Sequence, residues 1–193
     1  MAIDIGSIFE KIHALETELD AELARRAAEL RFGFEHGKII FEQEVLRRHR
    51  ELKVSLWAYL KRANILIVLT APVIYSLIIP LVIFDLFLFA FQAVCFPSYG
   101  IKRVKRSDYV VFDRHHLAYL NIIEKINCAF CSYANGLIAY AREIASLTEA
   151  YWCPIKHAKR LQGLHPRYKD FADFGDAAAH ARHVETFYKK IGE

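Results

Sequence analysis

The sequence predicts an all-α, membrane-attached helical bundle, because one long apolar run lies between stretches whose apolar residues recur at helical spacing. Of the 193 residues, 54% are hydrophobic and 25% are charged. Together these fractions indicate one strongly apolar block among otherwise polar helices. We expect three parts: N-terminal amphipathic helices at 1–63, a membrane-embedded segment at 64–97, and a cytoplasmic helical domain at 98–193.

The first part has the apolar spacing of a helix that binds another helix. Between Ile8 and Leu30, apolar residues recur at steps of three, four or seven, and Glu and Arg fill the other faces. Such a stripe packs on its own protein or forms a short coiled coil with a partner helix or a second copy of the chain. A second helix is expected from about Lys38 to Asn64.

The apolar run at 65–96 contains a single formal charge, Asp85. Eighteen or more apolar residues in succession predict a segment within the hydrocarbon of a bilayer. As one straight helix the run would be about 48 Å long, whereas the hydrocarbon is about 30 Å thick. The run is therefore too long for one untilted span, and Pro72 and Pro80 offer points at which the helix can break.

The charges beside the run indicate how it enters the membrane. Basic residues mark the cytoplasmic side of short flanks, and their numbers before and after the run are nearly equal. We therefore predict a re-entrant hairpin kinked at Pro72 and Pro80, with both ends at the cytoplasmic face of the inner membrane. A single tilted, kinked span is the alternative. The flanking residues are Arg47, Arg48, Arg50, Lys53, Lys61 and Arg62 before the run, and Lys102, Arg103, Lys105, Arg106 and Arg114 after it.

Two polar features accompany the run. Asp85 is expected near the tip of the hairpin or paired with a neighbouring helix, because a charge in lipid is costly. The basic strip IKRVKR at 101–106 is expected to meet anionic lipid headgroups, so membrane lipid is a predicted partner. The net charge of +4 is too small to indicate nucleic acid.

Helix-forming residues from about Asp113 to Arg160 include the best candidates for metal ligands. Cys128 and Cys131, with Cys153 and His157, supply three thiols and one imidazole, a usual ligand set for structural zinc. Iron is the alternative and would imply electron transfer or redox sensing. No signal peptide is expected at the N-terminus, so a reducing setting without disulfides is predicted. Each cysteine can also be read as a small packing side chain.

Helix geometry decides which of these ligands can meet. In one continuous helix Cys131 and Cys153 lie about 33 Å apart and cannot share an ion. A bend near 146–149 would favour the Cys3His centre, whereas a break at Asn135 and Gly136 would favour two smaller clusters. One cluster would contain Glu124, Cys128, Cys131 and Glu143, and the other His115 or His116 with Glu149, Cys153 and His157.

Two segments, NCAFCSYANG at 127–136 and YWCPIKHA at 151–158, resemble an uncharacterised family of bacterial integral membrane proteins. The resemblance covers roughly 112–158. It implies a bacterial inner-membrane setting and carries no activity, so no catalytic residue follows from it.

Three functions remain open. The first is a membrane protein whose cytoplasmic helices bind a transition metal. The second is a non-catalytic adaptor that acts through its N-terminal helix. The third is a lipid-acting enzyme, although no conventional catalytic motif supports it. Its candidate residues are Asp85, Asp113, Arg114, His115 and His116.

Overall fold

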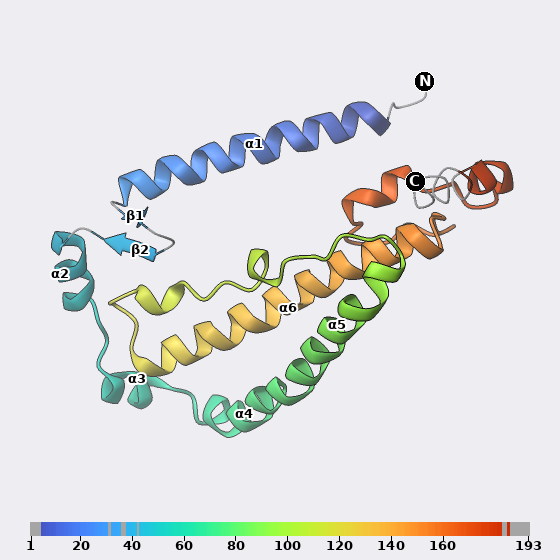
Figure 1. Ribbon diagram of the computed structural model, residues 1–193. Coiled ribbons are helices and arrows are strands. Elements are labelled where there is room, and N and C mark those ends of the chain that lie inside the picture. The colour runs from blue at the N-terminus through green and yellow to red at the C-terminus, as the bar shows by residue number, and fades with distance from the viewer. Residues whose placement is uncertain (1–4, 31, 36–37, 42, 183–184, 186–193) are drawn as a thin grey trace. The chain divides into compact units, whose positions relative to one another are not determined.

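The computed structural model describes residues 5–30, 32–35, 38–41, 43–182 and 185 (Figure 1). These residues are predominantly helical, which confirms the predicted all-α class. The described strands are the short pair β1 (Phe32–Glu35) and β2 (Lys38–Phe41). The α-helices are α1 (Ile5–Glu29), α2 (Gln43–Glu51), α3 (Leu56–Arg62), α4 (Ile65–Ser76), α5 (Ile78–Ser98) and α6 (Ile122–Trp152).

The chain divides into two compact units whose boundaries differ from the predicted three parts. One unit contains Met1–Lys61 and Asp113–Lys125, and the other contains Arg62–Phe112 and Ile126–Glu193. The apolar run is thus grouped with the sequence that follows it, because its helix packs on residues of α6.

In the first unit, α1 displays its apolar stripe, with Ile12, Leu15, Leu19 and Leu23 between 45% and 63% exposed. The helix expected at 38–64 is replaced by β2, α2 and α3. Strand β2 pairs antiparallel with β1, with Phe41 opposite Phe32. The β-branched and aromatic sequence KIIF suits a strand better than a helix.

In the second unit, α4 and α5 form a nearly continuous helical rod, Ile65–Ser98, which we call the rod. The predicted re-entrant hairpin is therefore wrong, because the chain does not reverse. Leu77, between the two helices, keeps right-handed helical angles (φ −61°, ψ −16°), and its N–H donates to the carbonyl of Ile74. The next turn closes from the N–H of Leu81 to the carbonyl of Leu77.

The prolines explain why the rod is irregular at Leu77 and yet continuous. Pro80 has no N–H for the carbonyl of Ser76, and its ring crowds that carbonyl, so the helix is disturbed one turn earlier. The irregularity places Pro80 in the first turn of α5, where the missing N–H costs least. Pro72 lies inside α4.

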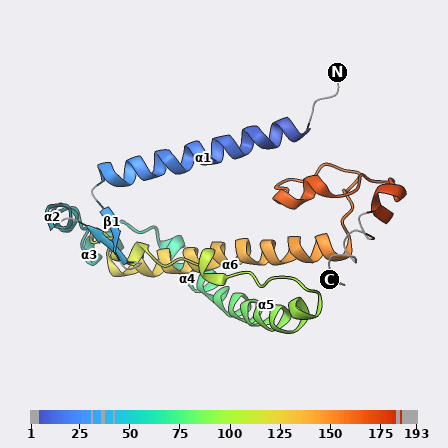
Figure 2. The ribbon, with the colours of Figure 1, turned by 45° about the horizontal axis from the view of Figure 1, so that its top comes forward.

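The rod and α6 run side by side in the same direction (Figures 1 and 2). Tyr75 bonds Asn127, and farther along Asp85 bonds Tyr133 and Gln92 bonds Tyr140. The last two pairs are each separated by 48 residues, which fixes the parallel register. The buried core between them consists of Phe96, Val110, Tyr133, Leu137, Tyr140 and Ile144.

The segment at 101–112 returns along this core and explains Gly136. A Cβ on Gly136 would lie 2.5 Å from the carbonyl oxygen of Tyr109 and 2.9 Å from the Cα of Val110. Gly136 therefore permits a close backbone approach within an unbroken helix. The predicted break at Asn135 and Gly136 is wrong, because α6 continues from Ile122 to Trp152.

Local signals define both ends of α6. The N–H of Glu124 donates to Asn121 Oδ1 (3.1 Å), and the N–H of Asn121 donates to Glu124 Oε2 (2.8 Å), which is a reciprocal cap. Pro154 follows the last helical turn and cannot extend it. The helix thus occupies only the middle of the stretch of helix-forming residues at 113–160.

Most of the rod is exposed. Each residue at 65–69 is between 48% and 66% exposed, so this part of α4 has no packed face. In α5, Ile79, Ile83, Phe87 and Val94 are 50–71% exposed, opposite the face that meets α6. By length and composition, the rod is the one described helix that passes as a membrane span, and its most apolar window is wholly unburied.

Candidate functional site

Asp85 is the centre of an ion-pair cluster, which we call the Asp85 cluster and which consists of Asp85, Arg106 and Tyr133. Arg106 Nη2 lies 2.7 Å from Asp85 Oδ2, and its Nε lies 3.1 Å from Oδ1. Tyr133 on α6 donates its hydroxyl to Oδ2 at 3.0 Å. The prediction that Asp85 pairs with a neighbouring helix is confirmed.

The contacts of the Asp85 cluster shift the pKa values of its two donors, Arg106 and Tyr133. The hydrogen bond to Asp85 raises the pKa of Arg106. Burial, followed by the hydrogen bond to Asp85, raises the pKa of the Tyr133 hydroxyl. Because both oxygens of Asp85 accept hydrogen bonds from these donors, the side chain serves as a structural acceptor.

Gln92 is a second polar residue of α5 that bonds α6, and it is almost completely buried. Its amide nitrogen donates to the hydroxyl of Tyr140, and its Oε1 accepts the N–H of Val104 at 2.8 Å. Both its donor and its acceptor are used, which removes most of the cost of burying an amide. Gln92 thereby ties α5 to α6 and to the returning segment.

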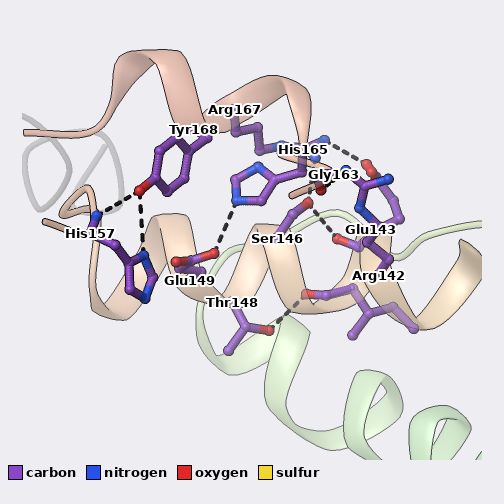
Figure 3. Close-up of polar contacts among 11 residues, drawn as sticks. Arg142, Glu143, Ser146, Thr148, Glu149, His157, Gly163, His165, Arg167 and Tyr168 are labelled. Atoms are coloured by element: carbon purple, nitrogen blue, oxygen red, sulfur yellow. Dashed lines mark hydrogen bonds and ion pairs between the residues drawn. The ribbon is translucent and has the colours of Figure 1, made fainter. Parts of the chain in front are cut away.

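A second polar group, which we call the C-terminal clamp, fastens the segment at 163–167 to α6 (Figure 3). Arg167 donates to Glu143 Oε1 at 2.6 Å and to Ser146 Oγ at 2.7 Å. His165 Nε2 lies 3.0 Å from Glu149 Oε2. A charged donor bonded to a carboxylate makes a stronger contact than a neutral pair does.

The C-terminal clamp resembles catalytic machinery in its residue types and differs from it in its hydrogen bonds. The Ser146 hydroxyl donates to the backbone carbonyl of Glu143 at 2.8 Å and accepts from Arg167, so His165 does not activate it. His165 Nδ1 is buried with no partner among the described residues, while Nε2 faces Glu149. This arrangement holds a chain segment and lacks an activated nucleophile.

The structure does not bring the predicted Cys3His ligands together. Cys128 is half-buried and Cys131 is exposed on α6, and Cys153 follows the end of the same helix. Because α6 does not bend, Cys131 and Cys153 remain about 33 Å apart. No group of three or more His, Cys, Asp or Glu side chains suited to a metal occurs within the described part of the chain.

The other predicted ligands have different partners. His157 donates its backbone N–H to the Tyr168 hydroxyl at 2.6 Å, and the two rings stack (Figure 3). His116 is exposed in η2 (Arg114–His116), with its ring 3.9 Å from that of His115. Glu124 caps α6. The smaller clusters predicted from a break in α6 therefore do not form among the described residues.

Sequence reasoning predicted that Asp85 pairs with a neighbouring helix, but it missed the partners of Asp85, the contacts of Gln92 and the C-terminal clamp. The N-x-x-E pattern at Asn121 and Glu124 was a readable capping signal. For the clamp there was no local signal, because Arg167 lies 24 residues from Glu143 and 21 from Ser146.

Three comparisons with known proteins gave no match. No protein-family model matches the chain, and neither a curated protein nor a solved structure matches it. The likeness of 127–136 and 151–158 to a bacterial membrane family stays a prediction.

Proposed function

We propose that this protein is a membrane-attached adaptor that holds cytoplasmic helices at the face of a bacterial inner membrane. The observation that carries the proposal is the exposed rod. More than a dozen large apolar side chains of Ile65–Ser98 are exposed. Lipid is the solvent that such a surface requires, and it is the first partner that we assign.

The size of this exposed surface supports lipid as its surroundings. Burying one such side chain completely is worth about 1.5–3 kcal/mol, so covering the rod is worth on the order of 20 kcal/mol. A typical domain is stable by only about 5–15 kcal/mol. Covering the rod therefore outweighs the folding stability of an average domain.

The polar groups support an adaptor more than an enzyme. The Asp85 cluster and the C-terminal clamp use their donors and acceptors to join chain segments. The surface available for a protein partner is the exposed stripe of α1, which contains Leu15 and Leu19. We propose that this stripe binds a helix of another chain, either a second copy or a different protein.

Membrane fractionation of the full chain tests the attachment. We expect the wild type to remain in membranes after an alkaline wash. The variant Leu69→Asp/Val73→Asp, which puts charges on an exposed part of the rod, should leave the membrane fraction. The control Leu52→Asp/Leu164→Asp changes exposed leucines outside the rod and should stay. A wild-type protein that is monodisperse in buffer without detergent or lipid contradicts the proposal.

The α1 contact is tested by the mass of the detergent-solubilised protein. Leu15→Asp/Leu19→Asp should lower that mass, because charges interrupt the apolar stripe. Ala14→Asp/Ala21→Asp, on the other side of the helix, should leave it unchanged. Equal masses for wild type and both variants, together with unchanged cross-linked products, exclude α1 as the contact.

A further inference from the structure

We infer that the rod lies along a single leaflet of an anionic bilayer and does not cross it, with α6 on the water side. The inference rests on the proposed membrane attachment and adds an orientation and a lipid class. The surface involved is the exposed face of the rod together with the basic strip, by which we mean Lys102, Arg103 and Lys105.

The first reason is that no section of the rod both spans a bilayer and lies free of α6. Going along the rod, hydrogen bonds to α6 begin at Tyr75, which bonds Asn127, and continue at Asp85 and Gln92. The section before them, 65–74, is about 15 Å long as a helix. That length equals half of a hydrocarbon core of about 30 Å.

The second reason is that α6 cannot accompany the rod through the hydrocarbon. Its sequence has Glu124 and Lys125 less than one turn before Asn127, and Arg142 and Glu143 farther along. Charged residues within the hydrocarbon are costly, and these two pairs lie next to the residues of α6 that bond the rod, Asn127 and Tyr140. If α6 stays in water, the helix attached to it stays at the surface.

The third reason is that α5 is exposed on one side. Asp85, Gln92 and Phe96 occupy its packed face, at helical spacing. Phe87 and Val94, on the opposite face, are exposed. A helix with one apolar face free and the other face on polar protein suits the plane of the interface.

The fourth reason concerns the charge beside this face. In the returning segment, Val104 packs toward the core, while Lys102, Arg103 and Lys105 are exposed. The Arg103 guanidinium lies 5.6 Å from the ring centre of Phe89, which is itself an exposed residue of α5. The cations thus border the apolar face, where anionic headgroups would lie, and each is worth about 1 kcal/mol there.

Sidedness in cells tests the orientation. In the full chain with its four cysteines replaced by alanine, single cysteines are placed by Lys53→Cys, before the rod, or Ser107→Cys, after it. We expect a membrane-impermeant maleimide to label neither site in intact spheroplasts and both after lysis. Labelling of one site from outside shows a crossing and overturns the inference, while the proposed attachment stands.

Vesicle binding tests the lipid class. The wild type should bind vesicles of equal parts phosphatidylcholine and phosphatidylglycerol more tightly than phosphatidylcholine alone. Lys102→Gln/Arg103→Gln/Lys105→Gln should weaken binding to the mixed vesicles on the order of 100-fold. The matched control Lys11→Gln/Lys159→Gln/Arg160→Gln removes the same charge at exposed sites elsewhere and should bind within a few-fold of wild type.

The outcomes separate the two claims. Equal binding to both kinds of vesicle, or equal losses in the two triple variants, refutes the role of the basic strip and leaves membrane attachment intact. Binding to neither vesicle, with a stable dimer in buffer, shows that a second copy covers the rod and refutes both claims.

Discussion

Asp85 shows, at the scale of a single residue, how a helix that is otherwise apolar keeps a charge. The carboxylate is 16% exposed, and Arg106 and Tyr133 supply its hydrogen bonds. Without these donors the same side chain would incur the full cost of desolvation. The Asp85 cluster is therefore expected to matter more for stability than an exposed surface ion pair does.

Asp85→Ala should destabilise the fold by about 1–3 kcal/mol, because it leaves Tyr133 and Arg106 without their acceptor. The lower part of that range is expected, since Arg106 is 44% exposed and water can solvate it. Denaturant unfolding in detergent measures the change. The control Asp108→Ala, at an exposed carboxylate, should remain within about 0.5 kcal/mol of wild type. If Arg106→Met costs as much in the Asp85→Ala background as in wild type, the pair is not coupled.

Gly136→Ala tests the close approach of Tyr109 to α6. In an ordinary helix this change stabilises by about 0.5–1 kcal/mol, but here the new Cβ meets backbone and must displace it. Such overpacking costs about 1–3 kcal/mol, so a net loss of about 1–2 kcal/mol is expected in the same unfolding assay. Ala139→Gly, at an exposed site of α6, gives the effect of helix propensity alone. A Gly136→Ala protein as stable as wild type would show that the returning segment is not packed there.

At the scale of elements, the unbroken α6 determines what its cysteines can do. Because Cys131 and Cys153 are separated along one helix, chelation should not lower the unfolding temperature of the purified protein. The exposed thiols of Cys131 and Cys153 should react with a thiol reagent faster than the half-buried Cys95 and Cys128. Stoichiometric metal, together with four protected thiols, would show instead that α6 bends or that copies share an ion.

The C-terminal clamp predicts a local effect. Arg167→Met removes the bonds to Glu143 and Ser146, so the segment at 163–171 should open more often without global unfolding. Hydrogen exchange at the N–H groups of Tyr168 and Phe171 should rise about 10-fold, which corresponds to about 1.4 kcal/mol. Exchange in the middle of α6 should not change. The control is Arg160→Met, which removes an exposed cation in the preceding loop. An equal rise in exchange in this variant would show that the C-terminal clamp does not hold the segment.

The elements also show what the sequence could and could not predict. The apolar run was readable because exclusion from water depends only on composition and length. The helix-forming residues at 113–160 do not by themselves show where α6 begins and ends, although Asn121 with Glu124 and Pro154 mark its ends locally. A glycine such as Gly136 predicts a break in a helix, but the same residue also allows a neighbouring backbone to pack closely against an unbroken helix. The sequence alone does not distinguish these two roles.

At the scale of the whole molecule, the folded protein should lose stability at alkaline pH. Burial raises the pKa of Tyr109 and of Tyr133 in the folded protein. A tyrosine hydroxyl has a pKa of about 10 in the unfolded chain and a higher pKa in the folded protein. Its contribution to stability is therefore complete below about pH 10 and is lost as the pH rises through the pKa of the folded protein. The unfolding temperature should therefore fall above about pH 10. Tyr109→Phe/Tyr133→Phe should flatten that fall, whereas the exposed control Tyr119→Phe should not. An identical pH profile in the double variant would exclude these two hydroxyls.

The tertiary arrangement was the least predictable feature. Pairing of Asp85 with another helix followed from the cost of a charge in lipid, but its partners Arg106 and Tyr133 did not, since nothing in their spacing distinguishes them from surface or core residues. The Cys3His side chains are not brought together for a related reason: ligand types at helical spacing indicate a common face, and they do not show which faces meet.

The parallel register of the rod and α6 has a consequence during synthesis. Asp85 leaves the ribosome 48 residues ahead of Tyr133. At about 5–20 residues per second, this interval is roughly 2–10 s. Throughout that time the apolar rod is already synthesised, whereas the part of α6 that packs on it is not. Capture by a chaperone or delivery to lipid must therefore begin before translation ends.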